Sequence, residues 1–409
     1  MIKIIHKGDC CGCTACYNSC PTKAIVMKED HEGFKYPVID EGKCIDCGLC
    51  EKVCPMKVPA QSEGNYGGVY AIQNNDITER KQSTAGGFFS VIADKILEEG
   101  GVVCATGWKH ADYIMVSHKL ISEKQQMEEL RGSKYVQSDL GDCFTKIKEL
   151  IKKGTRCLFV GTPCQVQGIR KFLGYNKLLV TIDLLCLGVS SPRIFEMWME
   201  YLESKYQEQV AAVYFRDKSF GYSTANVKIK FVNGKTLEQR YDAKSYLRTF
   251  FHGYNIRPSC YKCNFRCELR VSDFTIGDFH QISRINKSMD DDLGTTAVWI
   301  NSEQGKELFS QIQDRLTLHM LEETHDGIVG KIGKLTKIPG NREEFYQDVE
   351  RLNYRKLIKK WEPNSATAMI INVFKIVINK TPLRTVVFKA IKRRKAKKFE
   401  KRVNNINRE

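Results

Sequence analysis

The pattern of apolar and polar positions divides the chain into a short N-terminal part and a larger body. Over residues 1–60, short apolar runs alternate with loops that are rich in cysteine. The polar, glycine-containing stretch from Gln61 to Gly68 is typical of a linker, and longer strand and helix patterns begin at Val69. A chain of 409 residues exceeds one average domain, so we expect more than one.

The start of the body predicts a helix followed by a strand. Apolar residues recur at helical spacing over 88–99, directly after the small, flexible turn at 83–87. Gly100 and Gly101 end this helix, and the apolar run at 102–107 has the pattern of a strand.

Residues 156–185 contain the clearest fold signal in the body. A strand at 156–160 leads through a tight turn into a helix at 165–173, and a second strand follows at 178–185. A strand, a helix and a strand within this length form a βαβ unit, whose two strands lie parallel. Further strands are expected near 211–216, 225–232 and 295–300, so the fold class is α/β with a mixed or parallel sheet.

These patterns predict three regions. Residues 1–66, which contain two cysteine runs with the spacing C-x2-C-x2-C-x3-C-P, form a ferredoxin-like dicluster domain. Residues 67–310 form the α/β body, and residues 311–409 form a helical extension with a basic tail.

Two cysteine runs in the N-terminal region have the spacing C-x2-C-x2-C-x3-C-P. The first comprises Cys10, Cys13, Cys16, Cys20 and Pro21, and the second comprises Cys44, Cys47, Cys50, Cys54 and Pro55. In such runs three thiolates bind one [4Fe–4S] cluster and the fourth binds the other cluster. One cluster is therefore expected on Cys10, Cys13, Cys16 and Cys54, and the other on Cys44, Cys47, Cys50 and Cys20.

Zinc is the alternative occupant of C-x2-C pairs, but a zinc site takes four ligands from two pairs rather than two closed runs of four. Cys11 falls inside the first gap of its run, and we interpret it as a bystander. The N-terminal part therefore predicts two [4Fe–4S] clusters and a role in electron transfer.

A third group of cysteines lies in the body. Cys164 and Cys186 each follow a strand of the βαβ unit, and Cys260 and Cys263 form one more C-x2-C pair. Because open α/β sheets bind ligands beyond the carboxyl ends of their strands, these four thiols could hold a third cubane. From spacing alone, buried free cysteines are an equally good interpretation. Cys104, Cys143 and Cys157 have no partner spacing and are expected in the core.

Composition places the chain among globular proteins with reduced thiols. Apolar residues make up 42% and charged residues 27%, and the seventeen cysteines follow an N-terminus without a leader pattern. We therefore expect a cytoplasmic protein whose cysteines are metal ligands. The net charge is +16, but residues 384–402 hold ten Lys or Arg and one Glu, so the body is not an electrostatic surface for nucleic acid.

The tail allows two interpretations. Residues 366–378 are apolar but too short to span a bilayer, and a polybasic run follows at 389–402. A peripheral contact with the anionic inner face of the membrane is one hypothesis, and a solvated basic helix after a core helix fits equally well. Nucleic-acid binding ranks last, because only Phe388 and Phe399 could stack on bases.

Five motifs occur in an order that resembles the beta subunits of the coenzyme F-420 hydrogenases and dehydrogenases, whose fold family includes chlorophyll-derivative reductases. The motifs are Ser83-Thr84-Ala85-Gly86-Gly87, the segment from Arg131 to Ser138, Gly161-Thr162-Pro163-Cys164-Gln165, the segment from Arg257 to Cys263, and the segment from Ser272 to Phe279. The resemblance covers roughly residues 1–300, including the ferredoxin head.

The resemblance implies FAD beside an iron–sulfur cluster. It places a third [4Fe–4S] cluster on Cys164, Cys186, Cys260 and Cys263. It places the flavin against Gly86, Gly87, Gly132, Ser133, Lys134, Tyr135, Gln137, Ser138 and Thr162. Glycine-rich turns at helix N-termini are suited to a pyrophosphate, although the G-x-G-x-x-G fingerprint is absent.

Two positions depart from the relatives. Leu187 stands where His is common, and His280 stands where an aromatic residue is common. His280 is a candidate proton donor to the substrate, although a single His in a turn more often has a structural role.

The sequence therefore predicts a flavin-dependent iron–sulfur oxidoreductase that passes electrons between a redox partner protein and a small two-electron substrate. The alternative is an electron-relay subunit of a larger complex, without a substrate of its own.

Overall fold

The computed structural model describes residues 1–59, 61–62, 67–111, 113–224, 226–238, 240–321 and 336–362, together with Thr381. The apolar segment and the polybasic run predicted in the tail lie outside these residues. In the described residues no helix is both long and apolar enough to cross a membrane.

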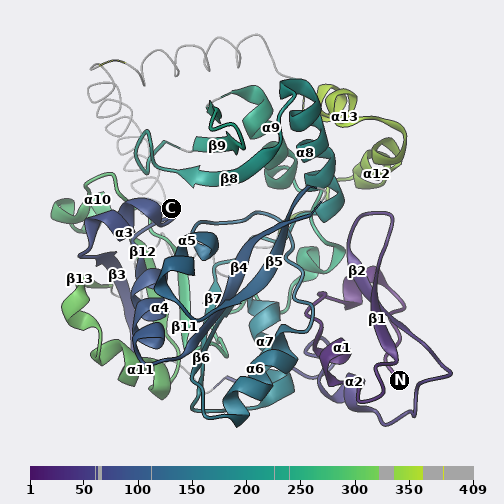
Figure 1. Cartoon of the computed structure of the whole chain (residues 1–409), viewed down its shortest axis with the longest axis horizontal. Helices are drawn as coiled ribbons and strands as arrows, with labels where there is room; N and C mark the ends of the chain where they lie inside the picture. Colours follow the sequence, from purple (N-terminus) through teal and green to yellow (C-terminus); the bar gives the residue numbers. More distant parts are fainter. Residues whose placement is uncertain are drawn as a thin grey trace, which may run out of the picture.

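The N-terminal region is a small domain beside the body (Figure 1). Its elements are α1 (Ala15–Ser19), β1 (Ile25–Glu29), β2 (Lys35–Ile39) and α2 (Leu49–Lys52). Strands β1 and β2 pair antiparallel. Ile2 and Ile25 pack in one small core with Cys16, Cys50 and Cys54. A domain this small has little apolar surface to bury, so the cysteine sulfurs themselves form much of its core.

The body is built on one eight-stranded sheet, in the order β13-β3-β12-β11-β7-β6-β4-β5. Its strands are β3 (Val69–Asn74), β4 (Val102–His110), β5 (Ile114–Ile121), β6 (Cys157–Gly161), β7 (Leu179–Leu184), β11 (Phe274–Asp278), β12 (Thr296–Ile300) and β13 (Leu316–Leu321). Strands β3, β4, β6, β7 and β11 run in one direction, and β5, β12 and β13 run in the other. The predicted mixed sheet is confirmed, and so is the parallel βαβ pair β6 and β7.

Helices cover both faces of this sheet. They are α3 (Ile77–Gln82), α4 (Phe88–Glu98), α5 (Met127–Leu130), α6 (Cys143–Lys152), α7 (Pro163–Leu173), α10 (Ile282–Ile285) and α11 (Glu303–Ser310). Successive residues of β6 face opposite sides: Leu158 packs with α4 and α11, and Phe159 packs with α6 and α7. Because β6 is buried on both faces, it is a continuous apolar run in the sequence.

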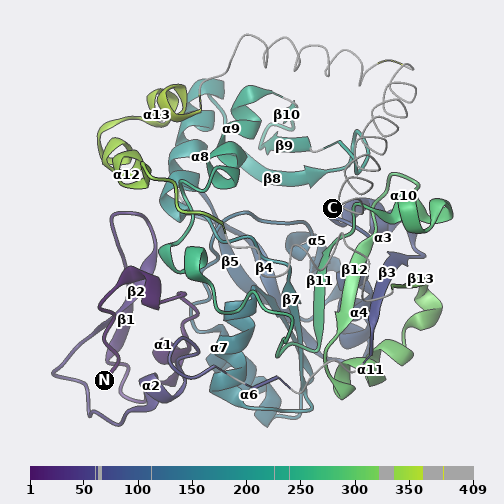
Figure 2. The same ribbon diagram turned by 180° about the vertical axis from the view of Figure 1, so that it is seen from behind.

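A second core stands above one edge of the body (Figures 1 and 2). It contains a three-stranded antiparallel sheet and four helices. These are β8 (Val210–Asp217), β9 (Asn226–Phe231), β10 (Thr236–Glu238), α8 (Pro192–Tyr206), α9 (Tyr241–Phe251), α12 (Arg342–Arg351) and α13 (Tyr354–Trp361). This unit is inserted between β7 and β11 and is completed by the C-terminal helices.

The predicted domain boundary at residue 310 is too early. Strand β13 pairs with β3 along its whole length, so the body sheet includes residues 316–321. The region after 310 is therefore not only helical, and its helices α12 and α13 belong to the second core. The pairing joins segments about 240 positions apart, which local periodicity does not reveal.

Candidate redox site

The four cysteines predicted for the outer ferredoxin cluster line one small cavity. Cys20, Cys44, Cys47 and Cys50 form its wall together with Met1 and Thr22, among others. Two backbone amides point at the sulfurs: Ala24 N–H donates to Cys20 Sγ at 3.2 Å and Ile2 N–H donates to Cys50 Sγ at 3.3 Å. Such N–H···S contacts surround thiolates that bind iron–sulfur clusters, so this donor set fits a cubane.

The other ferredoxin cluster, the inner one, is predicted on Cys10, Cys13, Cys16 and Cys54, and these cysteines are also close together. Burial, Cys10 and Cys54 raise the pKa of the Cys16 thiol to about 12. Cys16, Cys50 and Cys54 are buried in one cluster, so Cys54 lies close to the first run, and its predicted exchange with Cys20 stays a prediction. Burial also raises the pKa of Cys54, and an iron corner would replace the proton on such a thiol.

The body cysteines gather at one edge of the sheet. Cys164 lies at the start of α7, just after β6, and Cys186 follows β7, so both lie at the carboxyl ends of adjacent parallel strands. Cys260 lies in the loop from Pro258 to Lys262, and this loop closes over the same edge: Gly188 approaches the side chain of Cys260.

The four body thiols are electrostatically coupled. Burial and the thiols of Cys164 and Cys263 raise the pKa of Cys186 to about 12. Burial and the thiols of Cys186 and Cys164 likewise raise the pKa of Cys260. The Gly188 N–H donates to Cys186 Sγ at 3.4 Å. The structure thus brings together the set that spacing alone left open.

A cubane and a single metal ion need different arrangements of thiols. A cubane binds each thiolate at its own iron corner, whereas a zinc ion draws its sulfurs to within about 3.8 Å of one another. Within the described ranges, no three His, Cys, Asp or Glu side chains form a group that could hold a single metal ion.

The remaining cysteines divide into two groups. Cys104, Cys143 and Cys157 are buried in the core, as predicted, and Cys267 is exposed. Cys11, interpreted above as a bystander, is buried in one cluster with Cys13, and Cys164 packs against this cluster. It therefore lies at the contact between the ferredoxin domain and the body cysteines.

Two segments predicted to contact flavin meet in space. Ser133 N–H donates to Thr84 Oγ1 at 2.9 Å, and the two hydroxyl oxygens are 3.1 Å apart. The turn at 83–87 follows α3 and returns to the end of β3, where the Asn74 N–H donates to the Gly86 carbonyl oxygen at 2.7 Å. Because β3 runs parallel to β6 and β7, the turn lies at the same carboxyl edge as the body cysteines.

The two glycines of this turn have structural reasons of their own. The Gly86 N–H donates to Thr296 Oγ1 at 2.8 Å, and a Cβ there would lie 2.1 Å from the Ile72 carbonyl oxygen. Gly87 has φ +87°, which favours glycine, and it caps α4. Their predicted contact with a pyrophosphate stays a prediction.

The other residues predicted to contact flavin differ in how far their surroundings in the protein already occupy them. Gly132 has open space around it. Ser138 is buried between His118 and Gln165, with its hydroxyl 2.9 Å from His118 Nδ1. The Thr162 hydroxyl lies 3.2 Å from Cys164 Sγ, on the cluster side of the edge.

Lys134 and Tyr135 are both half-buried. Burial and the nearby Lys119 lower the pKa of Lys134 to about 7, and its ammonium donates to the backbone carbonyls of Leu130 and Arg131. The ring of Tyr135 packs edge-on against Phe215 and other aromatic rings.

His280 lies at this same edge, directly after β11. Its side chain is 45% exposed, its ring stacks on Tyr222 with the centroids 5.3 Å apart, and Nε2 is 3.8 Å from Asp278. Asp278 also pairs with Arg216 at 2.9 Å. Sequence reasoning missed Arg216, because it comes from β8 of the second core, far away in the chain.

A half-buried lysine supports the turn at 83–87. The Lys218 ammonium donates to the carbonyls of Ala85 and Arg80, both at 2.7 Å. Burial and the charge of Arg80 lower its pKa to about 7. This lysine holds the turn at 83–87 against the loop that follows β8.

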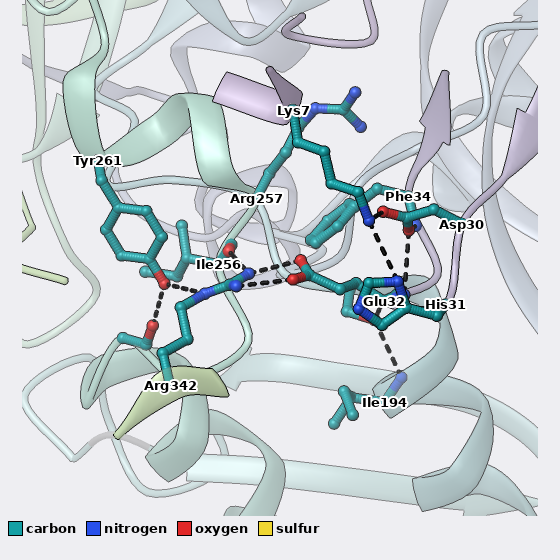
Figure 3. A network of polar contacts seen from close by, with 12 residues as sticks. Lys7, Asp30, His31, Glu32, Phe34, Ile194, Ile256, Arg257, Tyr261 and Arg342 are labelled. Carbon is teal, nitrogen blue, oxygen red and sulfur yellow. Dashed lines mark hydrogen bonds and ion pairs between the residues drawn. The ribbon is translucent and has the colours of Figure 1, made fainter. Parts of the chain in front are cut away.

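The ferredoxin domain is fastened to the body at several points. Glu32 forms a two-point ion pair with Arg342 of α12 (Figure 3). Lys35 pairs with Asp139 at 2.7 Å. Asn18 donates to the Gly141 carbonyl oxygen at 3.0 Å. None of these partners is close in sequence, and their pairing was not predicted.

A separate cavity of about 460 Å³ lies at the opposite, amino edge of the parallel strands. Arg170, Arg270 and Asp273 are among its lining residues, and none of the predicted site residues lines it. The body cysteines and the turn at 83–87 lie at the carboxyl edge, so the site predicted from the sequence is separate from this cavity.

Comparison with known families agrees with this arrangement. Residues 154–325 match the family described as the C terminus of the coenzyme F420 hydrogenase/dehydrogenase beta subunit, and residues 9–58 match the 4Fe-4S dicluster domain. The chain carries both domains. The family resemblance predicted from the motifs is thereby confirmed, and all four body cysteines lie within the matched beta-subunit range.

Two individual proteins are similar to this chain. The F subunit of the F(420)H(2) dehydrogenase of Methanosarcina mazei is 23% identical over 375 residues, which cover 88% of this chain and 98% of that protein. A chain in a structure of the F420-reducing [NiFe] hydrogenase complex from Methanosarcina barkeri covers 75% of this chain and 97% of its own length, at 14% identity and a TM-score of 0.45. The second likeness is too low to support an argument.

Proposed function

We propose that this beta-subunit-like chain is an iron–sulfur flavoprotein oxidoreductase. It passes electrons between three [4Fe–4S] clusters and a two-electron substrate that reacts at a bound FAD. Two clusters lie in the ferredoxin domain, and the third is held by Cys164, Cys186, Cys260 and Cys263.

This proposal rests mainly on one observation: the body cysteines and the turn predicted to contact flavin lie at the same carboxyl edge of the sheet. The body cysteines follow β6 and β7, and the turn at 83–87 packs on the end of β3, which runs parallel to those strands. Open α/β sheets bind their ligands at this edge, so a cluster and a flavin would be neighbours here.

The contact between domains supports a continuous path for electrons. A Cβ at Gly168 of α7 would lie 2.9 Å from Cys13 Cβ, so this helix packs directly on the inner ferredoxin cysteines. Cys164 lies four residues before Gly168, which is about one helical turn of roughly 5–6 Å. The inner ferredoxin cluster and the body cluster would thus be separated by little more than their own ligands.

The segment from Ser133 to Gln137 supports a short step to the flavin. Ser133 bonds Thr84 on the flavin side, whereas Gln137 Nε2 donates to the Cys11 carbonyl oxygen at 3.2 Å on the cluster side. Five residues of extended chain span at most about 14 Å between their first and last Cα atoms. When bound, FAD would supply the conversion between one-electron and two-electron transfer that clusters do not provide.

The alternative function is an electron-relay subunit without a substrate of its own. The similar protein from M. mazei is named as a subunit of a dehydrogenase, which favours a redox partner protein under either function. A contact of the basic tail with anionic membrane, and a cytoplasmic location, stay predictions from the sequence.

The two functions differ in the flavin, and extraction of cofactors tests it. Anaerobically purified full-length protein should contain about twelve irons per chain and release about one FAD on denaturation. Addition of reduced coenzyme F420, the compound in the family's description, tests one candidate substrate through bleaching of the flavin band. Twelve irons without any flavin, even after reconstitution, would favour the relay.

A further inference from the structure

Arg257 is a fully buried cation at the junction of the two domains. Its Nε donates to the Cys10 carbonyl oxygen at 2.9 Å, and Nη2 lies 3.7 Å from Cys10 Sγ. Nη2 also donates to the Lys35 carbonyl oxygen at 3.0 Å, and Nη1 donates to Gln137 Oε1 at 2.8 Å. The guanidinium stacks over the ring of Tyr36 at 4.3 Å.

None of these partners carries a carboxylate. Three other buried arginines each pair with a carboxylate: Arg170 pairs with Asp273, Arg80 pairs with Asp291, and Arg270 pairs with Asp183. No ion pair among the described residues includes Arg257. A buried charge without a counter-ion is strongly unfavourable, so a negative charge is expected beside this one.

The position of Arg257 identifies that charge. On one side it contacts Cys10, and on the other its carbonyl oxygen accepts the N–H of Cys260 at 2.9 Å. Cys10 and Cys260 are predicted ligands of two different clusters. A [4Fe–4S] cluster with four thiolate ligands carries a net negative charge in both oxidation states, and reduction makes that charge larger.

We propose that Arg257 is the shared counter-ion of the inner ferredoxin cluster and the body cluster, and that it raises the reduction potential of both. This inference rests on the proposed function for the presence of the body cluster. A positive charge and an N–H···S contact stabilise the reduced cluster more than the oxidised one. Arg257 therefore makes the inner ferredoxin cluster and the body cluster easier to reduce than they would be without it.

Potentiometric EPR titration of the full-length holoprotein tests this. Arg257→Met removes the charge, and Arg257→Gln removes it while keeping a hydrogen-bond donor, so the second variant remains if the first does not assemble. In these two neutral variants, the reduced-to-oxidised ratio of the inner ferredoxin cluster and of the body cluster, measured at a fixed potential, should fall at least tenfold. A tenfold change corresponds to about 59 mV for a one-electron couple. Arg257→Lys, which keeps the charge, should restore most of the ratio.

Two references separate this effect from loosened packing. The outer cluster, on Cys20, Cys44, Cys47 and Cys50, should keep its potential in every variant. Arg342→Met combined with Glu32→Gln loosens the same domain contact but removes both charges of an ion pair, so the net charge is unchanged and all three potentials should stay the same.

The possible failures are distinguishable. Unchanged potentials in both neutral variants, at about twelve irons per chain, would overturn the role of Arg257 alone. Equal shifts in the double variant of Arg342 and Glu32, or in Arg257→Lys, would also overturn it, because shape and not charge would then be the cause. About eight irons in the unmodified protein would remove the body cluster, and with it both the shared role and that part of the proposed function.

Discussion

Glu32 and Arg342 are 310 positions apart in sequence and form a two-point ion pair, with oxygen–nitrogen distances of 2.7 and 2.6 Å. Both side chains are largely buried, and Arg342 also donates to the Ile256 carbonyl oxygen at 3.0 Å. The pair fastens the hairpin loop of the ferredoxin domain to α12 and to the loop that carries Cys260. Helix α12 therefore helps to hold the ferredoxin domain and the loop that carries Cys260 in place.

Breaking this pair should destabilise the protein. Arg342→Met leaves the Glu32 carboxylate buried and unpaired, so we expect the free energy of unfolding to fall by about 3 kcal/mol in denaturant titrations. The matched control is Arg315→Met, which removes an ion pair with Glu98 whose side chains are 38% and 48% exposed. That change should cost less than about 1 kcal/mol. Similar losses in the two variants would contradict the docking role of Glu32.

Single Cys→Ser changes test the body cluster. Replacing Cys164, Cys186, Cys260 or Cys263 should lower the iron content from about twelve to about eight per chain and leave the ferredoxin signals in place. Cys267→Ser is the control, since this thiol is exposed and should not alter the iron content. If all four ligand variants keep twelve irons, these cysteines are only part of the core.

The contact of flavin with the turn at 83–87 can be tested with an isosteric pair. Gly87→Asp and Gly87→Asn introduce side chains of the same shape at a position with φ +87°, so they share the backbone strain. Only Asp adds a negative charge at the N-terminus of α4, where a pyrophosphate would bind. We expect the Asp variant to retain less FAD than the Asn variant, with equal ferredoxin iron. Equal FAD content would place the pyrophosphate elsewhere.

His118 should make the protein sensitive to acid. It is buried in β5 with Nε2 3.0 Å from the Val160 carbonyl oxygen, and burial lowers its pKa to about 4. Between pH 6.5 and 4 the unfolded chain binds a proton that the folded chain does not, so this part of the stability is present above pH 6.5 and is lost as the pH falls.

The His118→Gln variant isolates this effect, since cluster loss in acid affects both proteins alike. From pH 7 to pH 5 the stability of the unmodified protein relative to the variant should fall by about 2 kcal/mol, as measured by thermal unfolding. A difference that does not change with pH would show that His118 is not held neutral.

Local patterns were sufficient for a large part of this fold. The βαβ unit at 156–185 and the ferredoxin-like domain each depend on contacts within a few tens of residues, and both were predicted correctly. The spacing of Cys10 to Cys20 also predicts that Cys20 joins the opposite run, because two cubanes require that exchange, and this assignment stays a prediction.

Long-range pairings account for what was missed. Strand β13 joins the sheet through β3, Arg216 reaches Asp278 from another core, and Arg257 contacts Cys10 across 247 positions. Nothing in the local pattern distinguishes Arg216 and Arg257 from ordinary surface charges. A basic residue three positions before Cys260 was a usable signal only in retrospect, since a cation so close to a predicted ligand favours contact with the cluster.

A reductive titration with dithionite tests the central proposal most directly. Three one-electron clusters and one two-electron flavin should take up about five electrons per chain, with bleaching of both the cluster and the flavin bands. Uptake of about three electrons would contradict the flavin and leave a relay, and uptake of about two would leave only the ferredoxin clusters.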